Sequence, residues 1–269
     1  MIIFSQAFAL AEATATPLTH SRIGYHSYIR DLLAADISAS SETTNGPKSS
    51  ILTPDTYSYW EGTALPGWIK ADLGAARDIS YGAIVGFGLS GLGVKMETST
   101  NNVDWTQFSE ERVPSGDGPL MWIGTSVVAR WVRWSFTGAT APRVAVAMAG
   151  QVLAMQRAIY GGHGPIPLSR ETVLHNAMSR GGQFLGQGFR RHGVSGQLSY
   201  QNLTASWYRA NFDPFVKSAR QYPYVVAWRP ATFPLEVVYG WTAEDIRPSN
   251  SGKRDFMQVA WPIHGIGHA

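Results

Sequence analysis

One stretch decides the fold of the first half of the chain: Pro66-Gly67-Trp68-Ile69-Lys70-Ala71-Asp72-Leu73-Gly74. The apolar residues from Trp68 to Leu73 alternate with Lys70 and Asp72, which is the period of two that is typical of a strand. Turn signals divide the surrounding sequence into further short strands, recurring about every 8–12 residues with little helical periodicity, as in an all-β sandwich. We predict these strands over residues 18–25, 79–88, 94–99, 105–108, 127–136 and 144–155.

Three further segments accompany this stretch in a fixed order. Trp60 precedes it, and Ser99-Thr100-Asn101-Asn102-Val103-Asp104-Trp105 and Ala129-Arg130-Trp131-Val132-Arg133-Trp134 follow it. At these spacings the order resembles the discoidin family of galactose-binding-like β-sandwiches, over roughly residues 15–155. The resemblance implies an N-terminal jelly-roll that serves as an attachment module and not as a catalyst. It also implies a structural role for Asp72 and a mostly core position for Trp60, Trp68, Trp131 and Trp134.

The composition excludes several kinds of site. The 269 residues contain no Cys, so neither a disulfide nor a thiolate site can form. The net charge is only +3, and no basic run indicates nucleic-acid binding. No stretch of about 18 unbroken apolar residues predicts a membrane span. We interpret residues 1–12 as an ordered or docking N-terminal strand, because the apolar run lacks a basic segment before it and is interrupted by Ser5 and Gln6.

A second domain is predicted after a Gly- and Pro-rich boundary at residues 156–169, which divides the chain into domains 1–155 and 156–269. Residues 203–220 are its one convincing helical region, with Thr204 as the N-cap and a second start at Asp213-Pro214. The fold class is therefore mainly β, with one helical segment in the C-terminal part. Strands are predicted there over residues 172–180, 193–200, 224–228, 235–241 and 256–263, around a Gly-rich segment at 181–188.

Several strings in this second half occur together. They include Met155-Gln156-Arg157-Ala158-Ile159-Tyr160-Gly161-Gly162-His163 and Trp207-Tyr208-Arg209-Ala210-Asn211-Phe212-Asp213-Pro214-Phe215. The combination resembles a family of long-tailed bacteriophage tail proteins. The resemblance implies a tail-tube or distal-tail-like domain near the tail tip or baseplate of a virion. It also implies assembly in the host cytoplasm with other phage tail proteins, and a homo-oligomeric ring, hexamer or trimer.

Candidate residues follow from loop position and from these resemblances. Sugar recognition needs exposed aromatic rings beside hydrogen-bonding groups. The homo-oligomeric ring needs exposed residues around the Gly-rich loop and the helix, through which its subunits contact one another. The carbohydrate-binding candidates are Tyr57, Tyr59, Trp60, Asn101, Asn102 and Asp104, and the assembly candidates are Arg190, Arg191, Trp207, Tyr208, Arg209, Phe212 and Arg247.

We expect neither catalysis nor a cofactor. The seven His residues form no ligand-like pattern, no Gly-x-Ser-x-Gly elbow is present, and the Gly86-x-Gly88-x-x-Gly91 letters precede a strand and not the helix that a dinucleotide site needs. The main interpretation is a structural tail component whose sandwich touches host-surface glycan. One alternative is a carbohydrate-binding module of an adhesin or glycan-active enzyme, and another is a glycan hydrolase within residues 156–269.

Overall fold

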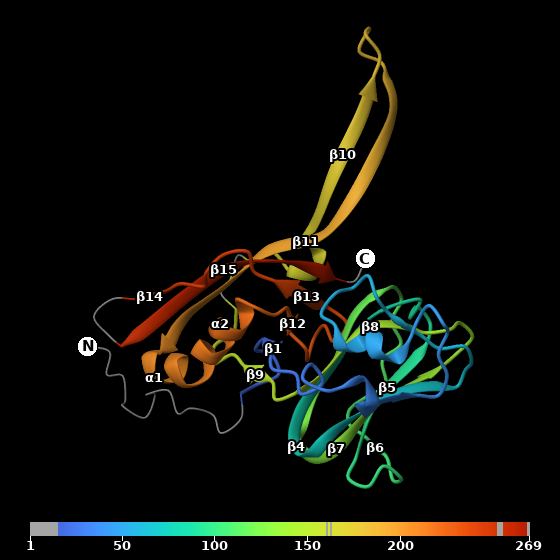
Figure 1. The fold of residues 1–269 in the computed structure, drawn as a ribbon. Helices are drawn as coiled ribbons and strands as arrows, with labels where there is room; N and C mark the ends of the chain where they lie inside the picture. The colour runs from blue at the N-terminus through green and yellow to red at the C-terminus, as the bar shows by residue number, and fades with distance from the viewer. Residues whose placement is uncertain (1–15, 160, 162, 252–254, 268–269) are drawn as a thin grey trace.

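The computed structural model describes residues 16–159, 161, 163–251 and 255–267. The chain is mainly β, with two antiparallel sheets (Figure 1). The N-terminal strand predicted over residues 1–12 lies outside the described residues. No helix in the described part of the chain is long and apolar enough to cross a membrane.

The first sheet forms the N-terminal sandwich that the sequence predicts. Its strand order is β3-β8-β4-β7-β5-β6, and β2 also pairs with β4. The strands are β2 (Ile37–Ala39), β3 (Trp60–Glu61), β4 (Gly67–Phe87), β5 (Gly93–Ser99), β6 (Thr106–Gln107), β7 (Gly118–Thr137) and β8 (Arg143–Gly150).

Strands β4 and β7 run through both layers of this sandwich. They pair along most of their length, with register shifts between Asp72 and Arg77 and between Ile79 and Tyr81. Residues 74–78 are exposed at the shift. The segment before it, residues 67–73, buries alternate side chains, whereas residues 81–86 after it are all buried. One core cluster collects side chains from both segments, including Ile69 and Ile84. Trp60 and Trp134 are fully buried in this cluster, whereas Trp68 and Trp131 are only partly buried.

The second sheet has the order β10-β11-β15-β13-β12-β1-β9, with β14 beside β15. Two of its strands flank the sandwich in sequence: β1 and β9 pair with each other, and β1 also pairs with β12. The chain therefore enters the sandwich from the second sheet, after β1, and returns to that sheet at β9. The strands are β1 (Arg22–Gly24), β9 (Leu153–Ala154), β10 (Arg170–Met178), β11 (Phe184–Thr204), β12 (Tyr224–Ala227), β13 (Val237–Trp241), β14 (Pro248–Asn250) and β15 (Phe256–Gly267).

The helical region lies against this second sheet. It comprises α1 (Ala205–Trp207), a π turn (Tyr208–Phe212) and α2 (Asp213–Ala219), which follow one another without a break. Asp213 therefore lies inside the helical region and makes no side-chain cap, so the predicted second start at Asp213-Pro214 is corrected. The structure confirms Thr204 as the N-cap, because its side chain accepts a hydrogen bond from the Trp207 amide. Three short 3₁₀ helices lie elsewhere: η2 (Ala34–Asp36), η3 (Lys48–Leu52) and η4 (Ile166–Leu168).

The helix explains why two predicted interface residues are not at the surface. Phe212 is fully buried and Tyr208 is 4% exposed, because both pack into the core of the second sheet. Phe212 lies edge-to-face against Trp261, with 5.5 Å between the ring centroids. Neither side chain offers a surface to a partner, so the expectation of an interface role is corrected for both.

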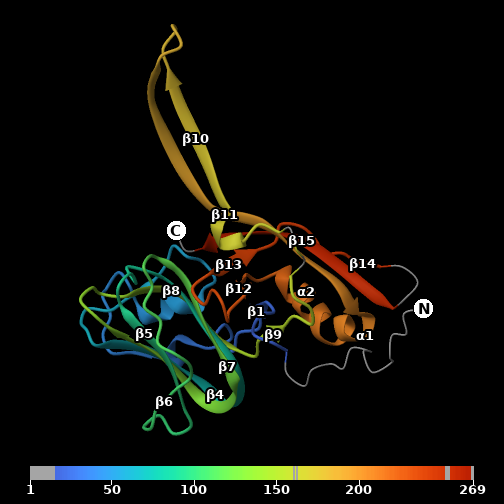
Figure 2. The same cartoon turned by 180° about the vertical axis from the view of Figure 1, so that it is seen from behind.

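The two sheets pack on each other through a third apolar cluster. Val225, Ala227, Val237 and Tyr239 of β12 and β13 meet residues of the sandwich such as Tyr81 and Val85. In addition, the Tyr239 hydroxyl donates a 2.6 Å hydrogen bond to the carbonyl oxygen of Pro54. The sandwich therefore lies directly against the second sheet (Figure 2).

A long β-ribbon projects from the second sheet (Figures 1 and 2). It consists of β10 and the outer part of β11, which pair from Arg170 with Val194 to Met178 with Phe184. We call this ribbon, residues 170–193, the arm. At its turn, the Ser179 amide donates a 2.8 Å hydrogen bond to the Gln183 carbonyl. Most of the Gly-rich loop predicted over residues 181–188 is therefore strand, because β11 begins at Phe184.

Candidate functional site

The loop before β3 presents an aromatic ring at one end of the sandwich. The Asp55 carboxylate accepts hydrogen bonds from the backbone amides of Tyr57 (3.1 Å) and Ser58 (2.8 Å). Such a turn fixes the loop through local side-chain to backbone bonds. The Ser58 bond is the largest cause that lowers the pKa of Asp55 below its ordinary value. The Tyr57 ring is left 92% exposed.

Charged hydrogen-bonding groups follow this ring in β3. Glu61 is the cross-strand partner of Arg143, and Arg143 Nε donates a 2.7 Å hydrogen bond to Glu61 Oε1. That bond is the main cause that raises the pKa of Arg143. The guanidinium also lies over the Tyr59 ring, 5.5 Å from its centroid. We call Tyr57, Tyr59, Glu61 and Arg143 the tip cluster.

Trp60 does not belong to the tip cluster, although the sequence places it between two members. It is fully buried, its ring contacts Phe136 at a centroid distance of 5.8 Å, and its indole N–H donates to the Ser41 carbonyl at 2.9 Å. The strand period of two explains this placement, because successive side chains point to opposite faces. Trp60 is therefore removed from the carbohydrate candidates.

The hairpin candidates Asn101, Asn102 and Asp104 lie away from the tip cluster. Strand β5 starts at Gly93, opposite Thr137 and next to the Phe136 that Trp60 contacts, and it ends six residues later at Ser99, opposite Trp131. The Asn101–Asp104 turn follows Ser99, at the far end of this strand. The structure thus separates the six predicted carbohydrate candidates into two groups.

The Asn101 side chain holds this turn together. Its Oδ1 accepts from the amides of Val103 and Asp104 at 2.9 Å each, and its Nδ2 donates to Asp104 Oδ2 at 2.7 Å. Asn102 has a left-handed φ of 62°, and its Oδ1 accepts a 2.8 Å bond from Lys70 Nζ. Asn101 and Asp104 therefore have most of their polar atoms engaged within the turn, which favours a structural role.

A second aromatic surface was missed in the sequence. Trp68, Trp105 and Trp131 lie partly buried on or beside the outer face of strands β4 and β7. Each ring is accompanied by a cation: Lys70 lies 5.0 Å from the Trp68 centroid, Arg133 4.1 Å from Trp105 and Arg130 4.5 Å from Trp131. The alternation in residues 68–73 could have revealed Trp68, since Ile69, Ala71 and Leu73 take the inward positions. These three rings are partly buried and each lies next to a cation, whereas the Tyr57 ring of the tip cluster is 92% exposed and offers the freer aromatic surface.

The remaining assembly candidates occupy different positions. Arg209 Nη1 donates to the Ala205 carbonyl at 2.9 Å, and Trp207 is partly buried against the core of the second sheet. Arg247 is exposed and lines a hollow beside β14 and β15. The backbones of Arg190 and Arg191 lie in the arm, opposite Val173 and Thr172, and their side chains lie outside the described part of the structure. The structure brings no two of these side chains into one described site.

Metal and acid–base chemistry find little support in the described residues. Within residues 16–159, 161, 163–251 and 255–267, no three His, Asp or Glu side chains are grouped as metal ligands would be. The large pKa shifts there belong to Tyr side chains such as Tyr81 and Tyr200, whose burial raises the pKa of the phenol. Buried phenols of this kind are packing elements of the core.

Comparison with known families identifies the sandwich. Residues 36–149 match the family model described as the F5/8 type C domain. The N-terminal half of this chain therefore contains an F5/8 type C domain. The predicted discoidin resemblance is confirmed for this half. None of the comparisons supports the predicted resemblance of the second half to phage tail proteins, which stays a prediction. No curated protein matches the chain significantly.

Solved structures similar to the chain cover this same part of it. A chitosan-binding module from a chitosanase/glucanase of Paenibacillus sp. IK-5 is 14% identical, with a TM-score of 0.42, over 47% of this chain and 99% of that one. The module CpGH89CBM32-6 of Clostridium perfringens is 17% identical, with a TM-score of 0.40, over 47% and 99%. CpGH89CBM32-5 of the same organism, solved with GalNAc-β-1,3-galactose, is 14% identical, with a TM-score of 0.40, over 44% and 97%.

Proposed function

We propose that the F5/8 type C domain binds carbohydrate at the tip cluster, in a non-enzymatic attachment role. The observation that carries the proposal is the exposed Tyr57 ring in the loop that leads into β3, where Glu61 pairs with Arg143 and Arg143 lies over the Tyr59 ring, on a domain of this family. The ring offers a flat apolar face for the C–H groups of a sugar. The carboxylate and the guanidinium offer an acceptor and donors for its hydroxyl groups.

The names of two similar solved structures suggest which ligands to test first. One is a chitosan-binding module, and another was solved with a galactosamine-containing disaccharide. We therefore choose chitosan oligosaccharides and GalNAc-β-1,3-galactose as the first probes. Single-site affinity is expected to be weak, because one exposed ring and one ion pair supply few contacts.

The test uses the whole chain in affinity electrophoresis and calorimetry with these two probes. Tyr57→Ala is expected to weaken binding at least about tenfold, which equals ~1.4 kcal/mol, without changing the unfolding midpoint. Phe189→Ala is the matched control, because Phe189 is also an exposed ring (75%) but lies on the arm. Arg143→Gln should weaken binding as well. If Tyr57→Ala bound as well as the unaltered protein, the tip cluster would not be the site.

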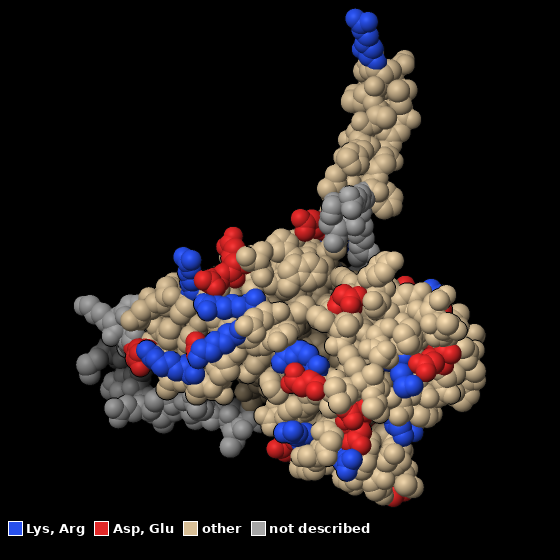
Figure 3. Space-filling model, viewed as in Figure 1, with Lys and Arg blue, Asp and Glu red and all other residues tan. Residues whose placement is uncertain are grey.

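We also propose a second role, assembly through the arm. All nine residues of β10 are exposed, and the arm exposes the large apolar side chains Val173, Leu174, Met178, Phe184, Leu185 and Phe189. Its described surface carries little charge (Figure 3). An isolated two-stranded ribbon is only marginally stable in water, and exposed apolar surface of this kind favours a contact. Within the described part of the chain, no further strand pairs with the outer edges of the arm, which leaves backbone groups for a neighbouring chain.

This second role keeps the predicted tail ring as a proposal, with the arm as its contact surface. We propose that the arm of one copy contacts the next copy, giving a ring in a virion tail, where repetition would raise the avidity of weak glycan binding. Light scattering over a concentration series is the test. A double change, Phe184→Asp with Phe189→Asp, should lower the mass that forms at high concentration. Val128→Asp, at an exposed (60%) position of the sandwich, is the control. A monomer at all concentrations for the unaltered chain would count against self-assembly.

A further inference from the structure

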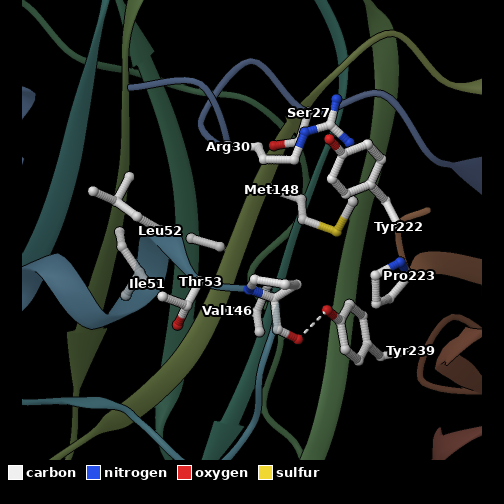
Figure 4. Close-up of a pocket in the computed structure, with 12 residues that line it drawn as sticks. Ser27, Arg30, Ile51, Leu52, Thr53, Val146, Met148, Tyr222, Pro223 and Tyr239 are labelled. Carbon is white, nitrogen blue, oxygen red and sulfur yellow. Dashed lines mark hydrogen bonds between the residues drawn. The ribbon is translucent and has the colours of Figure 1, made fainter. Parts of the chain in front are cut away.

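A pocket lies between the sandwich and the second sheet (Figure 4). The empty space among its lining residues is about 350 Å³, which includes space that is open to solvent, so the pocket is a shallow hollow and not an enclosed cavity. Four parts of the chain line it: the segment after β1, the helix η3 and the loop after it, strand β8, and the turn before β12 together with β13. Such sites between two packed units are common positions for ligands.

The floor of the pocket is apolar. Val146, Ala147 and Met148 of β8 and Ile51 of η3 are each less than 7% exposed. The nearby polar atoms of the floor are already engaged: the Ser27 hydroxyl accepts from the Ile29 and Ala149 amides at 3.3 Å each, and the Tyr239 hydroxyl donates to the Pro54 carbonyl at 2.6 Å. Little remains in the floor to bind hydroxyl groups, so it suits a hydrocarbon segment better than a sugar.

Arg30 is the one charged residue among those that line the pocket. The Tyr222 ring covers one face of its guanidinium, with 3.7 Å between Cζ and the ring centroid. Arg30 Nε is buried and has no hydrogen-bond partner among the described residues. The nearest carboxylate is that of Asp31, 3.6 Å from Nε and 75% exposed, which is too far for a hydrogen bond. Nε of Arg30 is thus an unsatisfied donor at this pocket.

We infer that this pocket binds a small amphiphilic carboxylate, with its hydrocarbon part on the β8 floor and its carboxylate against the edge of Arg30. A carboxylate matches the in-plane donors of a guanidinium and would satisfy the buried Nε. Stacking on Tyr222 fixes the plane of the guanidinium, and with it the directions in which its N–H groups donate. The site is separate from the tip cluster and does not depend on carbohydrate binding.

The experiment titrates the whole chain with octanoate by calorimetry, with octanol and octylamine as probes of the same length. Saturable binding of octanoate at one site per chain is expected, and octanol and octylamine should bind at least tenfold more weakly. Arg30→Gln should weaken octanoate at least tenfold. Arg229→Gln is the matched control, because this arginine also lies over an aromatic ring, 5.6 Å from the Trp228 centroid, but does not line the pocket.

A second variant guards against a change in folding at Arg30. Thr53 is exposed and lines the pocket, so Thr53→Trp should fill its rim and abolish octanoate binding while leaving the buried core in place. The variant also loses the 2.9 Å bond from the Thr53 hydroxyl to the Ser50 carbonyl, so its unfolding midpoint is measured alongside. The proposal is overturned if octanoate shows no saturable binding, if octanol binds as tightly as octanoate, or if Arg30→Gln or Thr53→Trp leaves the octanoate affinity unaltered. Unaltered octanoate affinity in Arg229→Gln supports it, and a tenfold loss there would overturn the assignment to Arg30.

Discussion

Asp72 and Arg130 form a two-pronged ion pair across β4 and β7, with Nε to Oδ1 at 2.7 Å and Nη2 to Oδ2 at 2.8 Å. Asp72 Oδ1 also accepts a 2.9 Å bond from the amide of Gly74, whose φ of +74° favours glycine. The pair lies where the register of β4 and β7 shifts. The acid of the fold-deciding stretch is therefore a structural element, as the discoidin resemblance implies.

This ion pair predicts a pH dependence of stability. The hydrogen bond from Arg130 is the largest cause that lowers the pKa of Asp72 below its ordinary value of 3.8. A depressed carboxyl pKa contributes stability above the unfolded pKa, and the contribution is lost as pH falls through the folded pKa. Asp72→Asn should therefore lower the urea midpoint at pH 7, and the gap to the unaltered protein should close below about pH 4. The exposed Asp78→Asn is the control, and a gap that does not shrink at all between pH 7 and pH 2 would contradict the prediction.

A second prediction concerns the hydrogen bond between the two sheets. Tyr239 is 2% exposed and donates to the Pro54 carbonyl at 2.6 Å. Tyr239→Phe removes this donor but keeps the ring, so it should lower the free energy of unfolding by about 1 kcal/mol. Urea unfolding followed by tryptophan fluorescence measures the change. Tyr57→Phe, at a 92% exposed ring, should leave stability unaltered. An equal loss in both variants would mean that the Pro54 bond is not the cause.

The sandwich could be predicted because its signals are local. Residues 68–73 alternate in burial along β4, so the pattern of the sequence reports the two faces of the strand directly. The N-cap at Thr204 is equally local, and the structure confirms it. The predicted second N-cap at Asp213 is wrong, because Asp213 has helical dihedral angles inside a helical region that continues from Ala205. In the two confirmed cases the neighbouring residues alone supply the physical reason for the structure.

The parts that could not be predicted depend on long-range packing. Arg22–Gly24 has to pair with Tyr224–Ala227, about two hundred residues away, and no local pattern specifies that partner. Trp60 and Trp68 have the same residue type, yet one is core and the other lies on the outer face, because strand register decides between them. One strand of the arm, β10, was predicted as residues 172–180, but the outer part of β11 was missed, because its glycines indicate a loop. Pairing with β10 extends these residues into a strand.

A third prediction concerns the helix N-terminus. The Thr204 hydroxyl accepts from the Trp207 amide at 3.4 Å and from Gln156 Nε2 at 3.0 Å, while the Thr204 amide donates to Gln156 Oε1 at 2.8 Å. Thr204→Ala removes the cap and one bond to Gln156, so it should cost about 1–2 kcal/mol of unfolding free energy. Thr204→Ser keeps the hydroxyl and should lose much less. Chemical denaturation measures both, and an equal loss for Ala and Ser would show that the hydroxyl is not the stabilising group.

The last prediction concerns the packing of β1 on the sandwich. A Cβ added at Gly24 would overlap the Tyr81 ring, with Cδ2 and Cζ of that ring only 2.8 Å away. The ring has little freedom to move, because Tyr81 is fully buried and its hydroxyl donates to the His26 carbonyl at 2.9 Å. Gly24→Ala should therefore destabilise the chain by about 1–3 kcal/mol, as overpacking does. Gly161→Ala is the matched control, because nothing among the described residues lies within 4 Å of the added Cβ. Thermal unfolding measures both variants, and a Gly24→Ala midpoint equal to that of the control would mean that β1 does not pack closely on Tyr81 in solution.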